Sequence, residues 1–346
     1  MGADMEGQSR AQAVAALRQI TSGMRSSQVL HVVAKLNIAD HLARKPMNAA
    51  ELATATGTDP AALHRVMRAL CALDVFAESS GGEFSLNPAA EMLRTDVPGS
   101  YRAAVLFTVG DVRWRCWSDL LGTVRAGGGG TDRALGMGIF EFYAAHPEES
   151  EIHDQAMRGV SAAQAAAVLE AMDFAQAGTV VDVGGGTGEL LAAILAANPS
   201  LRGVLFDLPH VVAQSTRVLT DHGIMDRVQV VGGNFFEDVP KGGDTYLLKT
   251  VIHDWDDARA MTILRNCRKA VMPKDELLII ERPLSDLGQP GKPEAFLIDL
   301  EMLLMTPGGR ERTRGEYGKL LSDTGFRLAR TVSTNSPIGI FEAHAV

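Results

Sequence analysis

The run Val180-Val181-Asp182-Val183-Gly184-Gly185-Gly186-Thr187-Gly188 decides the fold of this chain. A short, largely β-branched segment leads into glycines at 184, 186 and 188, and an apolar helical pattern over 190–197 follows at once. This order predicts a strand, a tight turn and a helix. Glycine lets the backbone approach a ligand where a Cβ would collide. Because the spacing is G-x-G-x-G, with Glu189 where a dinucleotide fold has its third glycine, the turn suits S-adenosylmethionine better than a dinucleotide. The alternative is a glycine turn that binds nothing.

A second motif follows the glycine turn at about 20 residues, the distance expected for a nucleotide-binding acid. The run Gly203-Val204-Leu205-Phe206-Asp207-Leu208-Pro209 indicates the next strand, which ends in an acid. A carboxylate at that strand end can accept hydrogen bonds from ribose hydroxyls. Asp207 can also cap the helix predicted after Pro209, and the two roles can coexist.

The composition indicates a globular protein. The 346 residues suffice for two domains and a large core, with 46% hydrophobic and 22% charged residues. A net charge of −9 argues against general nucleic-acid binding. No apolar stretch is long enough to span a bilayer, and the first ten residues lack a secretory signal, so we expect a cytoplasmic protein with no membrane partner. The three scattered cysteines (Cys71, Cys116 and Cys267) fit a reducing cytosol and have no metal-binding spacing.

The N-terminal third is predicted to be helical with a small β-hairpin. Residues 1 to about 10 are predicted to be mobile, and 11–43 carry a helical pattern. Two short helices and a hairpin of 75–78 with 83–86 follow, which is a winged-helix pattern. Winged helices often bind DNA, but the second helix offers only His64, Arg65 and Arg68 as donors. Packing against another protein is therefore the preferred interpretation.

The remainder is predicted to be an α/β domain. Helical patterns over 101–121 and 147–171 lead into an alternation of strands and helices, as a parallel sheet requires. The last two predicted strands lack a long helix between them and should pair antiparallel. The seven predicted strands are 179–183, 203–207, 228–231, 245–249, 276–280, 327–332 and 339–343. The fold class is thus α/β, with a Rossmann-like, mostly parallel seven-stranded sheet after an all-helical or winged-helix domain.

A histidine follows one of these strands at the edge where ligands bind. The strand 245–249 ends in Lys249, and His253-Asp254 come close behind. Ligands of open α/β sheets bind outside the carboxyl ends of the strands. With an ordinary pKa of about 6.5, histidine is the usual general base at neutral pH. A purely structural histidine is the alternative.

Each of several acids near this histidine has two possible roles. Asp254, Asp256 and Asp257 suggest a metal site, but capping of the next helix is favoured, so we expect no metal. Glu281 ends another strand and Glu311 lies in a loop before a helix. A carboxylate beside a histidine fixes its tautomer and stabilises its imidazolium. The alternative for each glutamate is an ion pair with the neighbouring Arg282 or Arg312.

Together these motifs resemble the plant-type small-molecule O-methyltransferases of the caffeic-acid type, which are class I S-adenosylmethionine-dependent enzymes, and especially their bacterial relatives in secondary metabolism. The resemblance runs from the winged-helix region to Val346. Besides the two runs quoted above, it rests on Gly232-Gly233-Asn234-Phe235-Phe236, on Leu248-Lys249 through His253-Asp254-Trp255, and on Pro307-Gly308-Gly309-Arg310-Glu311-Arg312-Thr313.

The resemblance implies an organisation and a set of roles. It implies a dimerisation domain over 1–100, a helical region over 101–175 that lines the acceptor pocket, and a cofactor-binding catalytic domain over 176–346. It also implies an intertwined homodimer whose N-terminal region contributes to the partner's pocket. His253 would be the general base, held by Glu281 and Glu311. The methyl donor would bind at Gly184, Gly186, Asp207, Leu208, Asn234, Phe235 and Lys249, and the acceptor at Met157, Asp254, Asp299 and Met302.

The chain departs from the family at one cofactor position. The family usually has aspartate followed by methionine where this chain has Asn234 and Phe235. The asparagine carbonyl can still accept a hydrogen bond from the adenine amino group, but without the charge. The phenyl ring can still cover a face of the adenine.

The predicted reaction is metal-independent methylation of a hydroxyl on an aromatic or polyketide-like small molecule. A phenol pKa of about 10 against about 6.5 for histidine favours proton removal concerted with methyl transfer. One alternative is a winged-helix regulator that senses S-adenosylmethionine. The negative net charge and the set of His253, Glu281 and Glu311 argue against it. The other is a same-fold enzyme that methylates nitrogen or carbon, or does not methylate, because the acceptor pocket decides the chemistry.

Overall fold

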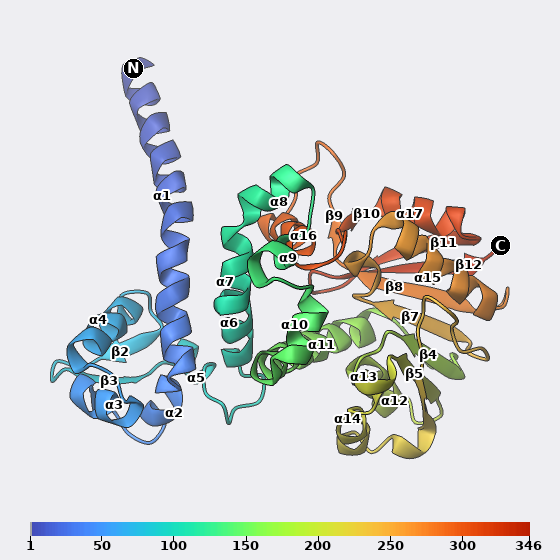
Figure 1. The fold of residues 1–346 in the computed structure, drawn as a ribbon, viewed down its shortest axis with the longest axis horizontal. Coiled ribbons are helices and arrows are strands. Elements are labelled where there is room, and N and C mark those ends of the chain that lie inside the picture. Colours follow the sequence, from blue (N-terminus) through green and yellow to red (C-terminus); the bar gives the residue numbers. More distant parts are fainter. Residues whose placement is uncertain (1) are drawn as a thin grey trace. The chain divides into compact units, whose positions relative to one another are not determined.

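Figure 1 shows the computed structural model, which describes the backbone of residues 2–346 and the side chains from residue 10 onward. The chain divides into two compact units. The N-terminal unit runs to Trp114 and includes Glu148–Gly159, and the C-terminal unit consists of Arg115–Pro147 and Val160–Val346. Of the segment that we predicted to be mobile, residue 1 lies outside the described residues, and the backbone from Gly2 is helical.

The N-terminal unit contains the predicted helices and hairpin. The helix predicted over 11–43 is divided at Asn37, whose φ of 53° lies in the left-handed region and interrupts the helical backbone. The hairpin is confirmed, and a third strand that we did not predict completes an antiparallel sheet in the order β1-β3-β2. The elements are α1 (Gly2–Lys35), α2 (Ile38–Leu42), β1 (Met47–Asn48), α3 (Ala49–Thr56), α4 (Pro60–Cys71), β2 (Phe76–Glu78), β3 (Glu83–Leu86), α5 (Pro88–Glu91) and α6 (Arg102–Val109).

The basic residues of α4 are partly neutralised within the unit. Arg68 and His64 both lie within ion-pair distance of Glu78, at 3.5 and 3.8 Å. A helix that docks on DNA needs positive charges free to face phosphate groups. This surface therefore favours the interpretation that the winged-helix region packs against protein.

The C-terminal unit is built on a seven-stranded mixed sheet in the order β11-β12-β8-β7-β4-β5-β6. All seven predicted strands are present within two residues of their predicted bounds. β12 pairs antiparallel with both of its neighbours, as predicted for the last two strands, while the other pairs are parallel. The strands are β4 (Thr179–Val183), β5 (Arg202–Asp207), β6 (Val228–Gly232), β7 (Thr245–Lys249), β8 (Glu276–Glu281), β11 (Phe326–Ser333) and β12 (Gly339–Ala345).

Helices cover both faces of this sheet (Figure 1). Because side chains alternate along a strand, Val180 packs with α12 and α14, whereas Val181 and Val183 pack with α15 and α17 on the other face. The helix predicted over 101–121 is instead three short helices, α6, α7 and α8. The further helices are α7 (Asp111–Ser118), α8 (Leu120–Ala126), α9 (Gly130–Leu135), α10 (Ile139–Ala145), α11 (Pro147–Ala171), α12 (Glu189–Ala197), α13 (Pro209–Val212), α14 (Thr216–Asp221), α15 (Asp257–Ala270), α16 (Pro293–Met305) and α17 (Arg314–Asp323).

Short elements complete the C-terminal unit. Two-residue strands β9 (Pro283–Leu284) and β10 (Arg312–Thr313) pair in parallel, and single 3-10 turns form η1 (Met225–Arg227) and η2 (Ile252–Asp254). In the described part of the chain, none of the helices combines the length and the apolar character needed to cross a membrane.

Candidate active site

The predicted site residues gather where four neighbouring strands end. β4 runs into the glycine turn, β5 ends at Asp207, β7 ends at Lys249 and β8 ends at Glu281. These strands are adjacent in the sheet, in the order β8-β7-β4-β5. Parallel strands place their carboxyl ends at one edge, so the glycine turn, the acid of β5 and the segment after β7 border one another.

The glycine turn is held by the acid at the end of β5. Asp207 Oδ2 accepts a hydrogen bond from the Gly186 amide at 2.8 Å, and Oδ1 accepts one from Leu208 at 2.6 Å. Gly186 has a φ of +61°, and apart from its two chain neighbours no described residue has an atom within 4 Å of where its Cβ would be. The turn thus opens onto free space next to a carboxylate with lone pairs left for hydroxyls. Both features fit a nucleoside such as that of S-adenosylmethionine.

Two further side chains close over this turn. A Cβ on Gly184 would meet Val251 Cγ2 at 2.7 Å and Phe235 Cε1 at 3.5 Å, so only glycine fits there. The phenyl ring of Phe235 therefore borders the turn, where it can cover an adenine face. Asn234 is already engaged, because its Oδ1 accepts from Phe236 N at 3.0 Å and its Nδ2 donates to Glu237 at 3.3 Å.

Lys249 is buried and hydrogen-bonds to neutral groups. Its Nζ donates to Ser161 Oγ at 3.2 Å, Gln164 Oε1 at 3.3 Å and Thr250 Oγ1 at 3.3 Å. Burial lowers its pKa, which the carboxylate of Asp182 opposes. Neither carboxyl oxygen of Asp182 has a hydrogen-bond partner among the described residues, and burial raises the pKa of Asp182 to about 7.

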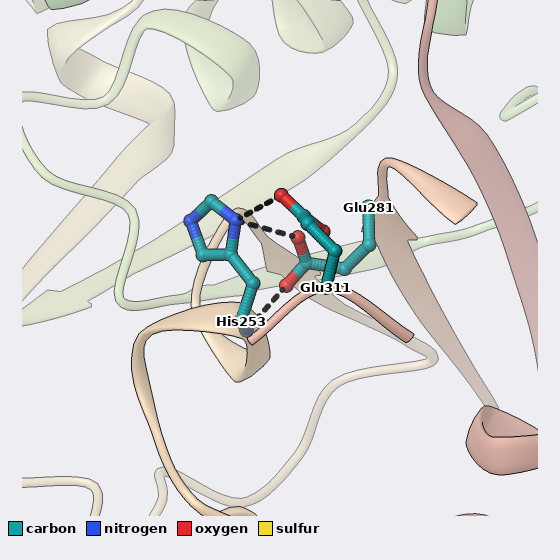
Figure 2. Close-up of side chains that lie close together, drawn as sticks. All are labelled: His253, Glu281 and Glu311. Atoms are coloured by element: carbon teal, nitrogen blue, oxygen red, sulfur yellow. Dashed lines mark hydrogen bonds and ion pairs between the residues drawn. The ribbon is translucent and has the colours of Figure 1, made fainter. Parts of the chain in front are cut away.

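His253 lies in η2, and the two predicted glutamates meet at one of its ring nitrogens (Figure 2). Nδ1 is 3.0 Å from Glu311 Oε1 and 3.6 Å from Glu281 Oε2. Glu281 Oε1 also accepts hydrogen bonds from the backbone amides of Val251, Ile252 and His253, at 3.1, 2.9 and 3.2 Å. Glu281 therefore holds the turn with one oxygen and faces the imidazole with the other.

The charges around His253 favour its protonated form. Burial lowers its pKa, but the carboxylates of Glu281, Asp254 and Glu311 outweigh burial and raise the pKa to about 10. Burial raises the pKa of Glu281 to about 7, with the imidazole opposing that rise. A histidine in this setting is a stronger base than a free imidazole, and carboxylates are in place to stabilise the imidazolium that forms.

The remaining predicted residues fall into different places. Asp299 supports the cluster, because its Oδ1 accepts from the Glu311 amide at 2.8 Å. Asp254 Oδ1 lies 3.6 Å from Nε2, the ring nitrogen that faces away from both glutamates. Met302 is half-buried on α16, and Met157 is half-buried on the part of α11 that belongs to the N-terminal unit.

Two of the neighbouring acids make local contacts within the same unit. Asp256 caps α15, since its side chain accepts from Arg259 N at 2.8 Å. Arg312 pairs with Asp257 at 2.7 Å and not with Glu311. Sequence reasoning missed Arg312 as a site residue, although its place directly after Glu311 was a signal. It also missed Thr250, a β-branched residue with a φ of 50° between Lys249 and the turn.

The fold and the site together define a class I S-adenosylmethionine-dependent methyltransferase. Family models match an O-methyltransferase domain over residues 117–327 and an O-methyltransferase dimerisation domain over residues 18–96. The chain therefore belongs to the O-methyltransferase family and is a member with both of its domains.

Relatives of known activity span nearly the whole chain. The phenazine O-methyltransferase of Lysobacter antibioticus is 40% identical, over 95% of this chain and 96% of the relative. The O-demethylpuromycin-O-methyltransferase of Streptomyces alboniger is 39% identical, over 94% and 87%. Among solved structures, a mitomycin 7-O-methyltransferase covers 98% of this chain and 99% of its own, with a TM-score of 0.91 and 33% identity. Matching structures hold S-adenosylmethionine or its demethylated product, so the cofactor is S-adenosylmethionine.

Proposed function

We propose that this enzyme methylates a hydroxyl of an aromatic or polyketide-like small molecule, with His253 as general base and without a metal ion. The arrangement of the imidazole supports this proposal most. Nδ1 is engaged by Glu311 and Glu281, which leaves Nε2 on the far side of the ring as the nitrogen that takes a proton (Figure 2). A base oriented by a third group in this way is a recurring catalytic arrangement.

The cofactor supplies an electrophilic methyl group, and the residues of this chain align the acceptor and remove its proton. The neutral imidazole takes the hydroxyl proton at Nε2, and the two glutamates stabilise the charge that results. A base pKa of about 10 is close to the value of about 10 for a phenol, so the transfer is nearly balanced in free energy. The raised pKa of His253 thus removes the mismatch that, from the sequence alone, favoured a concerted step, and it allows proton removal before methyl transfer as well as together with it.

The position of Asp254 supports a narrower proposal for the acceptor. Its carboxylate lies beside Nε2, so it would accept a hydrogen bond from a donor next to the reacting hydroxyl and repel an anion there. A relative from Streptomyces cremeus acts on 3-amino-4-hydroxybenzoate at the 4-hydroxyl, which has such a neighbouring amino group. We infer that acceptors of the catechol or o-aminophenol type are preferred over o-hydroxybenzoates.

A matched acceptor pair tests this inference. We expect o-aminophenols to exceed the corresponding o-hydroxybenzoates in kcat/KM by about tenfold or more, from roughly 1.5 kcal/mol for a hydrogen bond to a charged group. Asp254→Asn should shrink the difference. Equal turnover of both acceptors, unchanged by this substitution, would contradict the inference.

NMR of the products separates oxygen from nitrogen methylation. This check is needed because relatives from Streptomyces davaonensis and Pseudomonas aeruginosa are named as N-methyltransferases.

We also infer that the protein is a homodimer held through its N-terminal unit, consistent with the family model that matches there. Apolar side chains at helical spacing are exposed along α1: Val14, Leu17, Ile20 and Met24. Leu17 is 63% exposed and Ile20 75%, which is costly in water unless a partner covers them. Light scattering should show a dimer at micromolar concentration, and Leu17→Glu with Ile20→Glu should shift it toward monomer. A monomeric wild-type protein would contradict this inference.

A further inference from the structure

Arg312 is completely buried, and its guanidinium is surrounded by the segment that carries His253. Nη1 donates to the carbonyl oxygen of Ile252 at 3.0 Å, and Nη2 donates to that of Trp255 at 2.8 Å. Nε and Nη2 also donate to Asp257 Oδ1, at 3.0 and 2.7 Å. One side chain thus contacts the residue before the His253-Asp254 pair, the residue directly after it, and Asp257 two residues further on.

The same segment is held from its other side by Glu281. Glu281 Oε1 accepts hydrogen bonds from the three backbone amides of residues 251–253. Arg312 instead donates hydrogen bonds to the carbonyl oxygens of residues 252 and 255. The carbonyl of His253 is occupied as well, because it accepts from Arg310 N at 2.8 Å. Two buried side chains of opposite charge therefore fix both kinds of backbone group in one turn.

The backbone of this turn is strained at Thr250, so it needs these hydrogen bonds to keep its conformation. Thr250, at its start, has a φ of 50°, and a β-branched residue there costs of the order of 1–3 kcal/mol. Strain of this kind persists only where the surroundings over-determine the backbone. Without the guanidinium, the carbonyl of Trp255 would also be left without a described partner, and that of Ile252 would keep only the Trp255 amide at 3.3 Å, which costs further free energy.

We propose that Arg312 is a positioning residue that aligns His253 for proton removal by fixing the backbone of its turn. This inference rests on the proposed role of His253 as the base. Arg312 does not touch the imidazole, so its effect passes through the turn alone. A misplacement of about 1 Å in a catalytic group can cost about 10²-fold in rate. Arg312→Met, which keeps the length of the side chain but has no donor, should therefore lower kcat by roughly 10- to 100-fold.

Arg227 provides a matched control. Its guanidinium donates to the carbonyls of a different turn, at Leu195, Asn198, Pro199 and Leu201, where β5 begins and thus at the opposite edge of the sheet. Arg227→Met, like Arg312→Met, should lower thermal stability, because backbone carbonyls lose their donor. It should leave kcat within about twofold of wild type. The affinity of each variant for S-adenosylmethionine, measured by calorimetry, should remain close to wild type.

A double mutant separates positioning from general loss of structure. If Arg312 acts through His253, Arg312→Met should lower kcat in the wild-type background but cause no further loss in the His253→Ala background. Arg312→Lys, which retains the charge and a shorter donor, should give an intermediate kcat, and it takes the place of Arg312→Met if that variant does not fold.

The inference would be overturned if Arg312→Met, or Arg312→Lys in its place, lost no more kcat than Arg227→Met. It would also be overturned by an equal fractional loss with and without His253. A different result would overturn the proposed function itself, namely near-normal turnover by His253→Ala alone.

Discussion

The His253→Ala variant should keep its fold and bind S-adenosylmethionine nearly as well as wild type, while its turnover falls by roughly 10²–10⁴-fold. The imidazole is held on one side by Glu311 at 3.0 Å and by Glu281 at 3.6 Å, and the cofactor turn belongs to other residues. Removing the side chain therefore removes the base and leaves the donor site intact. Steady-state kinetics with calorimetry of cofactor binding measures both.

Three controls make this result specific. His222→Ala removes an exposed histidine of the same unit and should leave turnover unchanged. Glu311→Gln should lower turnover less than His253→Ala does. The two decreases should not add in the double mutant, because Glu311 acts through the imidazole. Chelators should have no effect. One ligand atom each from His253, Glu281 and Glu311 lies within 4.8 Å of the others, so the three side chains are close enough together to hold a cation. A bound ion at Nδ1 would take the place of the hydrogen bond between the imidazole and Glu311, on which the proposed mechanism depends. Near-normal turnover by His253→Ala, or loss of turnover with a chelator, would refute the mechanism.

Gly186→Val should weaken S-adenosylmethionine binding by at least roughly 100-fold, or about 2.7 kcal/mol. The position has two properties, a φ of +61° and open space where the Cβ would lie, next to the carboxylate of Asp207. The branched side chain would fill space that the cofactor needs. Calorimetry on the folded variant gives the affinity.

Gly223 offers a matched control for the backbone strain. It has a φ of +65°, and likewise no described residue beyond its chain neighbours has an atom within 4 Å of its Cβ position, but it lies after α14, away from the glycine turn. Both valine variants should lose about 1–2 kcal/mol of stability, since a side chain disfavours the left-handed region. Only Gly186→Val should lose affinity. Equal cofactor affinities in the two variants would show that the cofactor does not bind over Gly186.

The sheet was predictable because each of its strands carries a strong local pattern. The β-branched run before Gly184 and the alternation of strands with helices indicated β4 to β8, and the missing helix before residue 339 indicated the antiparallel end. Elements of two residues, such as β1, β9 and β10, are too short for any periodic signal. The break at Asn37 depends on a single left-handed residue, which hydrophobic periodicity does not record.

The cluster was predictable only in part. Glu281 was placed at a strand end and His253 close behind another, but only the family resemblance implied that they meet, and the structure places the two together. The sequence does not show that Glu281 divides its oxygens between the backbone and the imidazole. Nor does it show that Arg312 pairs with Asp257 rather than with the adjacent Glu311. Both depend on the path of a turn that spans only a few residues, and such paths are set by tertiary contacts.

The pH dependence of a single turnover tests most directly the central claim that a carboxylate-held His253 is the base. With the cofactor bound, the rate in wild type should rise with pH between about pH 6 and pH 10, because the pKa of about 10 leaves little neutral imidazole at pH 7. Glu311→Gln removes a negative charge, lowers the pKa of His253, and should move this rise to lower pH. The shift should disappear when His253 is also replaced by alanine. An unchanged profile in Glu311→Gln, or the same shift without His253, would contradict the role of His253 as the base.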